Sequence, residues 1–319
     1  MQCDSMAFGA IALAIVGSSW CLTGAILGRA PKDGLDTGMV QLGSSVVSIV
    51  AGIILGALLL PPSPVGGRVL AATLGTYALA GSLNFAALQA MAVGMQRGPN
   101  GRVWGIMQSA QLFSFLGGVV FFGDPLTPPR IVGMAFLVAA IALFAIAKDE
   151  GPAPGKPAAS RSGAGWRFWA FLSLAICAVQ QNLAAAPSHF EQARSVSPLL
   201  RAIAASTGTL CPAVAMLLAG AARDKAAFLR KVSSLARGRL WLYALGMQFF
   251  GLLFAYTLFY PGMDALGRAG AGALCWPILV GSCVLAFTAY STFVLKEKAT
   301  KLVALAVLSC LVGLFLICR

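Results

Sequence analysis

The chain has 319 residues, of which 59% are hydrophobic and only 10% charged, with a mean hydropathy of +0.84 and a net charge of +13. A water-soluble protein of this composition would expose more apolar surface than a compact fold can hide, so a soluble fold is excluded. One histidine and ten carboxylates are too few for the metal or acid–base clusters of a membrane enzyme. We therefore expect no enzyme, no catalytic residue, no metal and no cofactor, and we attribute the basic charge to membrane topology rather than to nucleic acid.

Apolar runs recur along the whole chain, and each is close to the roughly 20 residues that a helix needs to cross a bilayer. The sequence therefore predicts an all-α, polytopic membrane protein with ten transmembrane helices. Their expected ranges are 6–29, 37–60, 69–94, 101–122, 129–147, 167–186, 198–220, 239–262, 270–294 and 300–318.

A stretch rich in Gly, Pro, Ala and Ser divides these runs into two sets of five. It covers residues 149–165 and is typical of a linker, so we expect one five-helix unit over 1–148 and a second over 166–319. An odd number of spans per unit means that the second unit enters the membrane with the opposite orientation. Two such units predict the inverted-repeat plan of many secondary transporters.

A short motif recurs where the last two runs of each unit meet. The first unit has Phe122-Gly123-Asp124-Pro125-Leu126-Thr127 and the second has Leu295-Lys296-Glu297-Lys298-Ala299-Thr300. With Pro277 about 20 residues before Glu297, the chain resembles the drug/metabolite transporter superfamily of the ten-helix, EamA-like type, and within it the sugar-uptake branches that include the rhamnose–proton symporter. The resemblance implies two inverted five-helix repeats and a transport function.

Polar side chains recur at helical spacing within several runs. Gln41 begins a stripe of serines in the second run, and Trp104, Gln108 and Gln111 follow one another at i, i+4 and i+7 in the fourth. Such stripes mark either interhelical hydrogen bonds or a water-accessible cavity, because an unpaired polar group in hydrocarbon is unfavourable. We expect a substrate cavity near the membrane centre. The candidate binding residues are Gln108, Gln111, Trp104, Asn84, Gln41, Tyr256, Gln181 and Trp20.

The chemistry of these residues favours an uncharged ligand. Amides and hydroxyls pair with alcohol groups, and an indole such as Trp20 stacks on the apolar face of a sugar ring. No Asp, Glu, His or Lys falls in the middle of a run, so the candidates for proton coupling are His189, Glu191 and Asp264 near predicted helix ends. Solvated loop positions for these residues, and facilitated diffusion without coupling, stay open.

Two further expectations concern shape and orientation. Pro277 interrupts the ninth run and is expected to kink it, as a hinge or as a static bend. Loops on one side of the membrane carry 17 Lys and Arg residues against 6 on the other. By the positive-inside rule the basic loops are cytoplasmic and both termini lie outside. The expected location is the bacterial inner membrane.

The sequence thus predicts a secondary transporter that moves a small neutral polar metabolite, for example a sugar, by alternating access. Its expected partners are the small-molecule substrate, the lipid bilayer and, if transport is coupled, protons. An exporter of amino acids or amphiphilic metabolites is the alternative within transport. A membrane scaffold or sensor is the alternative outside it. A monomer and a homodimer both stay open.

Overall fold

The computed structural model describes residues 2–59, 65–98, 100–146, 165–294 and 300–317, and within them all regular structure is helical. The first half contains α1 (Gln2–Ser19), α2 (Cys21–Arg29), η1 (Ala30–Asp33), α3 (Thr37–Leu59), α4 (Gly67–Arg97), α5 (Asn100–Gln108), α6 (Gln111–Phe122) and α7 (Pro128–Ile146). The second half contains α8 (Gly165–Ala185), η3 (Ala186–His189), α9 (Glu191–Arg194), α10 (Pro198–Arg223), α11 (Lys225–Ser233), η4 (Ser234–Ala236), α12 (Gly238–Phe254), the π-helical turn η5 (Ala255–Phe259), α13 (Tyr260–Arg268), η6 (Gly272–Leu274), α14 (Cys275–Phe293) and α15 (Lys301–Ile317).

The all-helical prediction is confirmed, and a helix lies in each of the ten expected ranges. Seven helices are long and apolar enough to cross a membrane, and three shorter apolar helices cover Pro128–Ala140, Gly272–Phe287 and Lys301–Ile317. These are the properties of a multi-pass membrane protein. The figure of ten crossings stays a prediction. The short helix α11 lies in a stretch that was expected to be loop, and the predicted linker lies outside the described residues except for Gly165, which begins α8.

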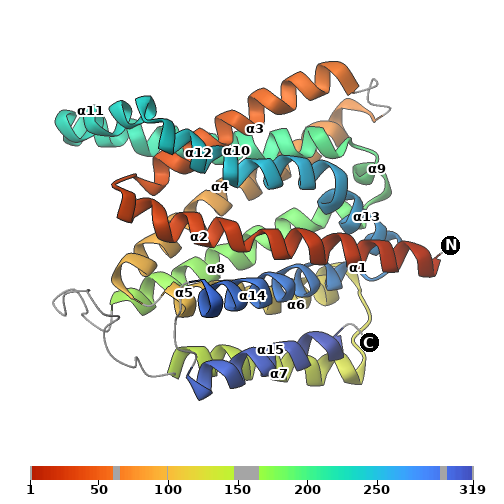
Figure 1. Ribbon diagram of the computed structural model, residues 1–319. Coiled ribbons are helices and arrows are strands. Elements are labelled where there is room, and N and C mark those ends of the chain that lie inside the picture. The colour runs from red at the N-terminus through yellow and green to blue at the C-terminus, as the bar shows by residue number, and fades with distance from the viewer. Residues whose placement is uncertain (1, 60–64, 99, 147–164, 295–299, 318–319) are drawn as a thin grey trace.

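The two halves interlock (Figure 1). Helix α4 packs on α8 and α10, α3 packs on α10 and α12, and α1 packs on α13 and α14. Helices α7 and α15 pair with each other at one edge of the bundle. Each of these contacts joins the first half to the second, so the two halves share one interior.

Glycines allow several of these helices to approach closely. A Cβ at Gly81 of α4 would lie 1.9 Å from the carbonyl oxygen of Ala205, and a Cβ at Gly208 of α10 would lie 1.8 Å from that of Ala78. The α7–α15 pair has the same kind of contact, because Gly133 and Gly313 each face the other's carbonyl. Small residues at a crossing let backbones meet, which is how helices pack in lipid, where burial of apolar surface drives little association.

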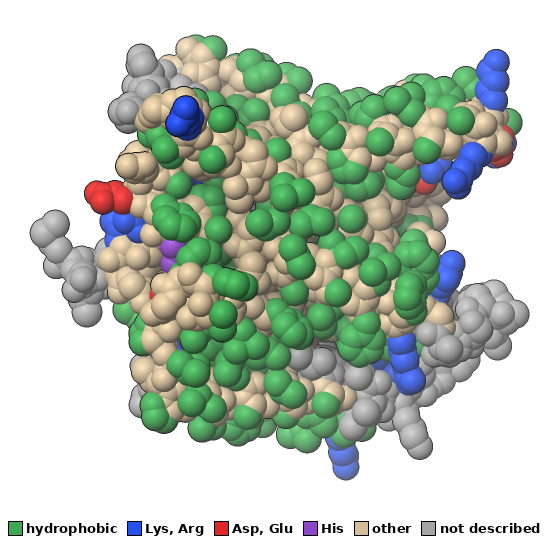
Figure 2. Space-filling model, turned by 180° about the vertical axis from the view of Figure 1, so that it is seen from behind, with side chains coloured by type: hydrophobic (Ala, Val, Ile, Leu, Met, Phe, Trp, Pro, Cys, Tyr) green, Lys and Arg blue, Asp and Glu red, His purple; other side chains and the backbone are tan. Residues whose placement is uncertain are grey.

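The two ends of the bundle differ in charge. The end that carries α11, called the basic end below, also holds Lys231 3.0 Å from Asp36 and Arg239 3.9 Å from Asp33. The N-terminus of α1 and the C-terminus of α15 lie at the opposite end of the bundle, called the terminal end below (Figure 1). Figure 2 shows hydrophobic side chains spread over the face between the two ends, with most of the visible Lys and Arg toward the basic end. An apolar band between polar ends fits a bilayer.

Candidate functional site

A central cavity of about 250 Å³ lies between the two halves. Its lining comes from α1 to α5 in the first half and from α8, α10, α12, η5, α13 and α14 in the second, whereas α7 and α15 contribute nothing. A pocket of this size, shared by both halves, is a natural place for a small ligand, because pockets form where packed units meet.

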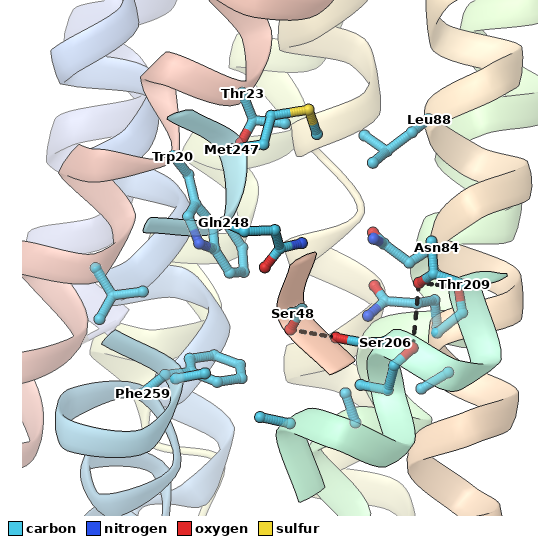
Figure 3. Close-up of a pocket in the computed structure, with 18 of the residues that line it drawn as sticks. Trp20, Thr23, Ser48, Asn84, Leu88, Ser206, Thr209, Met247, Gln248 and Phe259 are labelled. Atoms are coloured by element: carbon cyan, nitrogen blue, oxygen red, sulfur yellow. Dashed lines mark hydrogen bonds between the residues drawn. The ribbon is translucent and has the colours of Figure 1, made fainter. Parts of the chain in front are cut away.

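Hydroxyl and amide groups make up one wall of the cavity (Figure 3). Ser206 donates a hydrogen bond of 2.7 Å to the Ser48 hydroxyl, and Thr209 donates to the carbonyl of Gly81 at 3.1 Å. Beside them, Asn84 of α4 and Gln248 of α12 point into the open space from different sides. Neither amide has a hydrogen bond to the described part of the chain, so both have donors and acceptors available for a ligand.

Aromatic rings make up a second wall. The centroid of Trp20 lies 5.8 Å from that of Phe259 and 6.1 Å from that of Trp276. Trp20 stands at the break between α1 and α2, Phe259 ends the π-helical turn, and Trp276 lies in the first turn of α14. The rings of Trp20 and Phe259 therefore offer an apolar face across from Ser206, Thr209 and Asn84, with the Gln248 amide beside Trp20 (Figure 3).

The described residues that line the cavity include no Asp, Glu, Lys, Arg or His. A charged ligand would lose its hydration without gaining a counter-charge, which is costly in a low-dielectric interior. An uncharged ligand with hydroxyl or amide groups and one apolar face matches both walls.

Accessibility varies along the cavity. Toward the basic end and at mid-height, Ser19, Thr23 and Gln248 retain accessible surface, whereas Tyr77 and Tyr260 toward the terminal end are buried. Ser45 and Trp104, which line the cavity nearer the basic end, are equally buried, so the terminal end is marked by the edge-to-face packing of the Tyr77 and Tyr260 rings rather than by their exposure.

Five of the eight predicted binding residues line the cavity: Trp20, Asn84, Trp104, Gln108 and Gln181. Three of them are engaged with neighbours outside the cavity lining. Gln181 accepts a hydrogen bond of 2.8 Å from Ser114, Gln108 donates to Cys283 Sγ at 3.8 Å, and Trp104 stacks on Phe287 with the ring centroids 5.2 Å apart.

The other three lie elsewhere. The Gln111 amide contacts Cys310 at 4.0 Å in a separate void of about 10 Å³ between α5, α7, α14 and α15. Gln41 is buried with both amide atoms unpaired, and it is not part of the cavity lining. Tyr256 lies in the π-helical turn but is not part of the cavity lining, which takes Ala255 and Phe259 from that turn and Tyr260 just after it.

The structure corrects the expected surroundings of Asp264. It is buried in α13 and forms an ion pair with Arg201, whose Nη1 lies 3.0 Å from both carboxylate oxygens. A solvated loop position was therefore wrong for this residue. His189 ends η3 and stacks on Phe122 with the ring centroids 4.0 Å apart, and Glu191 begins α9 with an exposed side chain. None of the three lines the cavity.

Pro277 lies at the third residue of α14, in the first helical turn. The N–H groups of a first turn have no intrahelical partner, so the proline removes no hydrogen bond from the helix interior. The interior breaks occur instead at Trp20, at Ser109–Ala110 and at the π-helical turn, all close to the cavity.

The acidic residue of the first motif has a definite structural role. Asp124 Oδ2 accepts a hydrogen bond of 2.6 Å from the Ala273 N–H, just before α14 begins. Burial raises the pKa of this carboxyl above its usual range, and the Ala273 N–H, His189 and Arg130 partly oppose the shift. Its counterpart Glu297 lies outside the described residues. Within the parts of the chain that the structure describes, no three His, Cys, Asp or Glu side chains are placed to hold a metal ion.

Several lining residues were absent from the predicted site. Gln180 lines the cavity beside the predicted Gln181, and Gln248 supplies an amide from α12. Gln248 and Tyr77 belong to polar positions with helical spacing, which is a signal available in the sequence. Ser206 and Thr209 carried no such signal, because serine and threonine are common in packed membrane helices.

Comparisons with known proteins bear on the fold. No family model matches the chain, and no curated protein matches it. A solved structure described as "Crystal structure of protein" is similar over 99% of this chain and 98% of its own, with a TM-score of 0.60 and 13% sequence identity. At that identity the likeness establishes a shared fold only.

Proposed function

We propose that the chain is a secondary transporter that carries a small uncharged polar molecule across a membrane by alternating access. The observation that carries the proposal is the central cavity, which is uncharged and is lined by helices from both halves. In this proposal the chain has ten spans and belongs to the drug/metabolite transporter superfamily. The basic end faces the cytoplasm of a bacterial cell, and both termini lie outside the inner membrane.

A regular correspondence between lining residues supports the internal repeat. On α1–α2 and on α8, residues at matching positions face the cavity, each in the second half lying 161 positions after its counterpart in the first. The pairs are Val16 and Cys177, Ser19 and Gln180, Trp20 and Gln181, and Thr23 and Ala184. Each of these two segments also continues into a 3-10 turn that begins with Ala-Pro, at Ala30 in η1 and at Ala186 in η3.

The third expected helix of each half shows a second correspondence, here 171 positions apart. The pairs are Tyr77 and Gln248, Gly81 and Leu252, Asn84 and Ala255, and Leu88 and Phe259. Matching positions that face one shared cavity are what two inverted copies of an ancestral unit would produce. In such an architecture, rocking of the two units against each other exposes the same site to each side in turn.

The two walls favour a cyclic polyol or sugar as the substrate class. Its ring would lie on Trp20 and Phe259, and its hydroxyls would pair with Asn84, Gln248 and the Ser206–Thr209 segment. Stacking and hydrogen bonding then select the ligand without any charge.

A thermal-shift screen of the purified protein against sugars, polyols, amino acids and nucleosides tests the proposal. A ligand at about 100 times its Kd stabilises the folded form by about 2.7 kcal/mol. Uptake of the best ligand is then measured in proteoliposomes, with and without a pH gradient. An unchanged rate would assign facilitated diffusion, and a gradient-dependent rate would assign proton coupling.

Gln248→Ala and Gln111→Ala form a matched pair for this assay. Both remove a glutamine amide from a helix, but only Gln248 lines the cavity. We expect Gln248→Ala to weaken binding by about fivefold, the equivalent of one hydrogen bond, and Gln111→Ala to leave it unchanged. Equal effects of the two substitutions, or the absence of both ligand stabilisation and flux across the screen, would contradict the proposal.

A further inference from the structure

The terminal end of the cavity is closed by a layer of five side chains: Tyr77, Ser188, Arg201, Tyr260 and Asp264. Tyr77 and Tyr260 face the cavity and pack edge to face with their ring centroids 5.1 Å apart. Arg201 lies behind them, 5.7 Å from the Tyr260 centroid, and it is fully buried. This closing layer separates the binding cavity from the terminal end.

Arg201 is held by hydrogen bonds to one carboxylate and three backbone carbonyls. Its Nη1 contacts both oxygens of Asp264 at 3.0 Å, its Nε donates to the Val196 carbonyl at 2.9 Å, and its Nη2 donates to the carbonyls of Ala193 and Arg194. A guanidinium has five N–H donors in a fixed fork, and four of them have partners here: Nε, both N–H groups of Nη2 and one of Nη1. The arrangement is therefore rigid as long as Asp264 stays in place.

The layer joins three segments that would have to separate for a ligand to pass. Arg201 belongs to α10 and Asp264 to α13, and Ser188 of η3 donates a hydrogen bond of 2.8 Å to Asp264. Arg194 of α9 in turn donates to the Ser188 carbonyl at 3.2 Å. One buried carboxylate thus ties the end of α8 to the start of α10 and to α13.

The positions of the first half that correspond to Arg201 and Asp264 carry no charged residue. Lining positions of α3 and α10 correspond at a spacing of 157, since Ser45 and Ser48 match Ala202 and Ala205, so Ser44 takes the place of Arg201. The 171-position correspondence places Val93 opposite Asp264. The Arg201–Asp264 pair therefore has no charged counterpart at the matching positions of the first half. Such a pair resists separation while both charges are present, because separating it leaves an uncompensated buried charge.

We propose that the Arg201–Asp264 pair is the gate at the terminal end of the transport path and that it biases the empty protein toward the state open to the basic end. This inference rests on the proposed function, because a gate requires a path. Passage of a ligand toward the terminal end requires Asp264 to leave Arg201 and Ser188, which frees α13 from α10 and η3 while Arg201 keeps its hydrogen bonds to the carbonyls of Ala193 and Arg194. Substitution of both residues by apolar ones of similar volume removes the bias without leaving an unpaired charge.

The test measures access to the cavity from each end. A cysteine is introduced at Ser206, in the cavity wall, in a chain that also carries Cys211→Ser, and a membrane-impermeant maleimide is added to intact cells or to inverted membrane vesicles. A separate Lys225→Cys variant reports which preparation exposes the basic end. Modification at each position is quantified by mass spectrometry of the peptides.

With Arg201 and Asp264 intact, we expect Ser206→Cys to react only in the preparation that exposes the basic end. With Arg201→Met and Asp264→Leu together, it should also react from the terminal end, about tenfold faster than before, which corresponds to about 1.4 kcal/mol in the balance between the two states. Asp264→Asn, which keeps the shape of the side chain, should also raise the rate at which Ser206→Cys is labelled from the terminal end. Replacement of the exposed pair at the basic end, by Asp36→Leu and Lys231→Met, should leave terminal-end labelling unchanged.

Labelling that stays confined to the basic-end preparation in the double variant would overturn the gate. The gate would also be overturned if the buried Cys283 were labelled as strongly as Ser206→Cys in the double variant. That result would show that the pair only maintains the fold. Failure of the proposed function gives a different result: the labelling pattern switches as described, yet the protein transports no compound and no ligand protects Ser206→Cys.

Discussion

Gly208→Ala probes the contact that positions the polar wall of the cavity. The added Cβ would lie 1.8 Å from the Ala78 carbonyl oxygen, so α4 and α10 must separate by about 1.5 Å to reach an ordinary contact. The separation weakens the Ser82 hydrogen bond to the Gly208 carbonyl and the Thr209 hydrogen bond to the Gly81 carbonyl, each worth about 0.6 kcal/mol in membranes. Overpacking adds about 1–3 kcal/mol, and the higher helix propensity of alanine returns about 1 kcal/mol.

The net effect is a loss of about 1–3 kcal/mol, which is expected to lower the unfolding midpoint in detergent by about 5 °C. The same displacement moves Thr209 away from the cavity, so ligand stabilisation should fall as well. Gly75→Ala on α4 is the matched control, because its Cβ would meet no atom within 4 Å. Equal midpoints for Gly208→Ala and Gly75→Ala would refute the reasoning that close approach of α4 and α10 builds this wall.

Other substitutions test single elements of the site. Asn84→Ala should weaken ligand binding by about fivefold in a binding isotherm, the value of one hydrogen bond, whereas Thr257→Ala, on the exposed face of η5, should not change it. Trp20→Ala should weaken binding of a cyclic sugar by about 1 kcal/mol more than that of an open-chain polyol of equal carbon number, and equal losses would argue against ring stacking. Gln108→Ala should lower ligand affinity while the yield of folded protein stays normal, and unchanged transport would remove Gln108 from the site. For Asp124, burial raises the pKa of the folded state above that of the unfolded chain, so its contribution to stability is fully present below about pH 4 and is lost as the pH rises through the raised value. Asp124→Asn does not titrate, so its unfolding midpoint should fall less than that of the parent protein over this range; parallel curves would contradict the assignment.

The positions of the helices were predictable because a long apolar run has few alternatives. Membrane helices satisfy their own backbone hydrogen bonds, and the length of the bilayer sets the length of the run. The breaks within them were not predictable. With 3.6 residues per turn, Tyr260 lies about 120° from Gln248 around the helix axis, yet both line the cavity, because the π-helical turn between them changes the register.

An uncharged cavity lined by polar and aromatic side chains was predictable for the candidate site, but only some of its lining residues were. Gln108 and Gln111 are three positions apart and satisfy the same pattern, and both border the small void beside α7 and α15, yet only Gln108 also lines the cavity. Which side of a stripe faces the cavity depends on packing between helices that are distant in sequence. The same limit applies to Arg201 and Asp264, which are 63 positions apart, lie near predicted helix ends and gave no sign of pairing.

The interlocked arrangement of the halves has a consequence for the order in which the molecule is made. Helix α1 finds its neighbour α14 only after about 260 more residues have left the ribosome, which at roughly 5–20 residues per second takes on the order of 10 to 50 s. During that interval the early helices sit in the bilayer with the faces that will later meet α13, α14 and α15 covered by lipid or by insertion factors. Assembly of this protein is therefore completed by its last helices, and a nascent chain stopped before α14 would hold membrane-inserted segments without a finished interior.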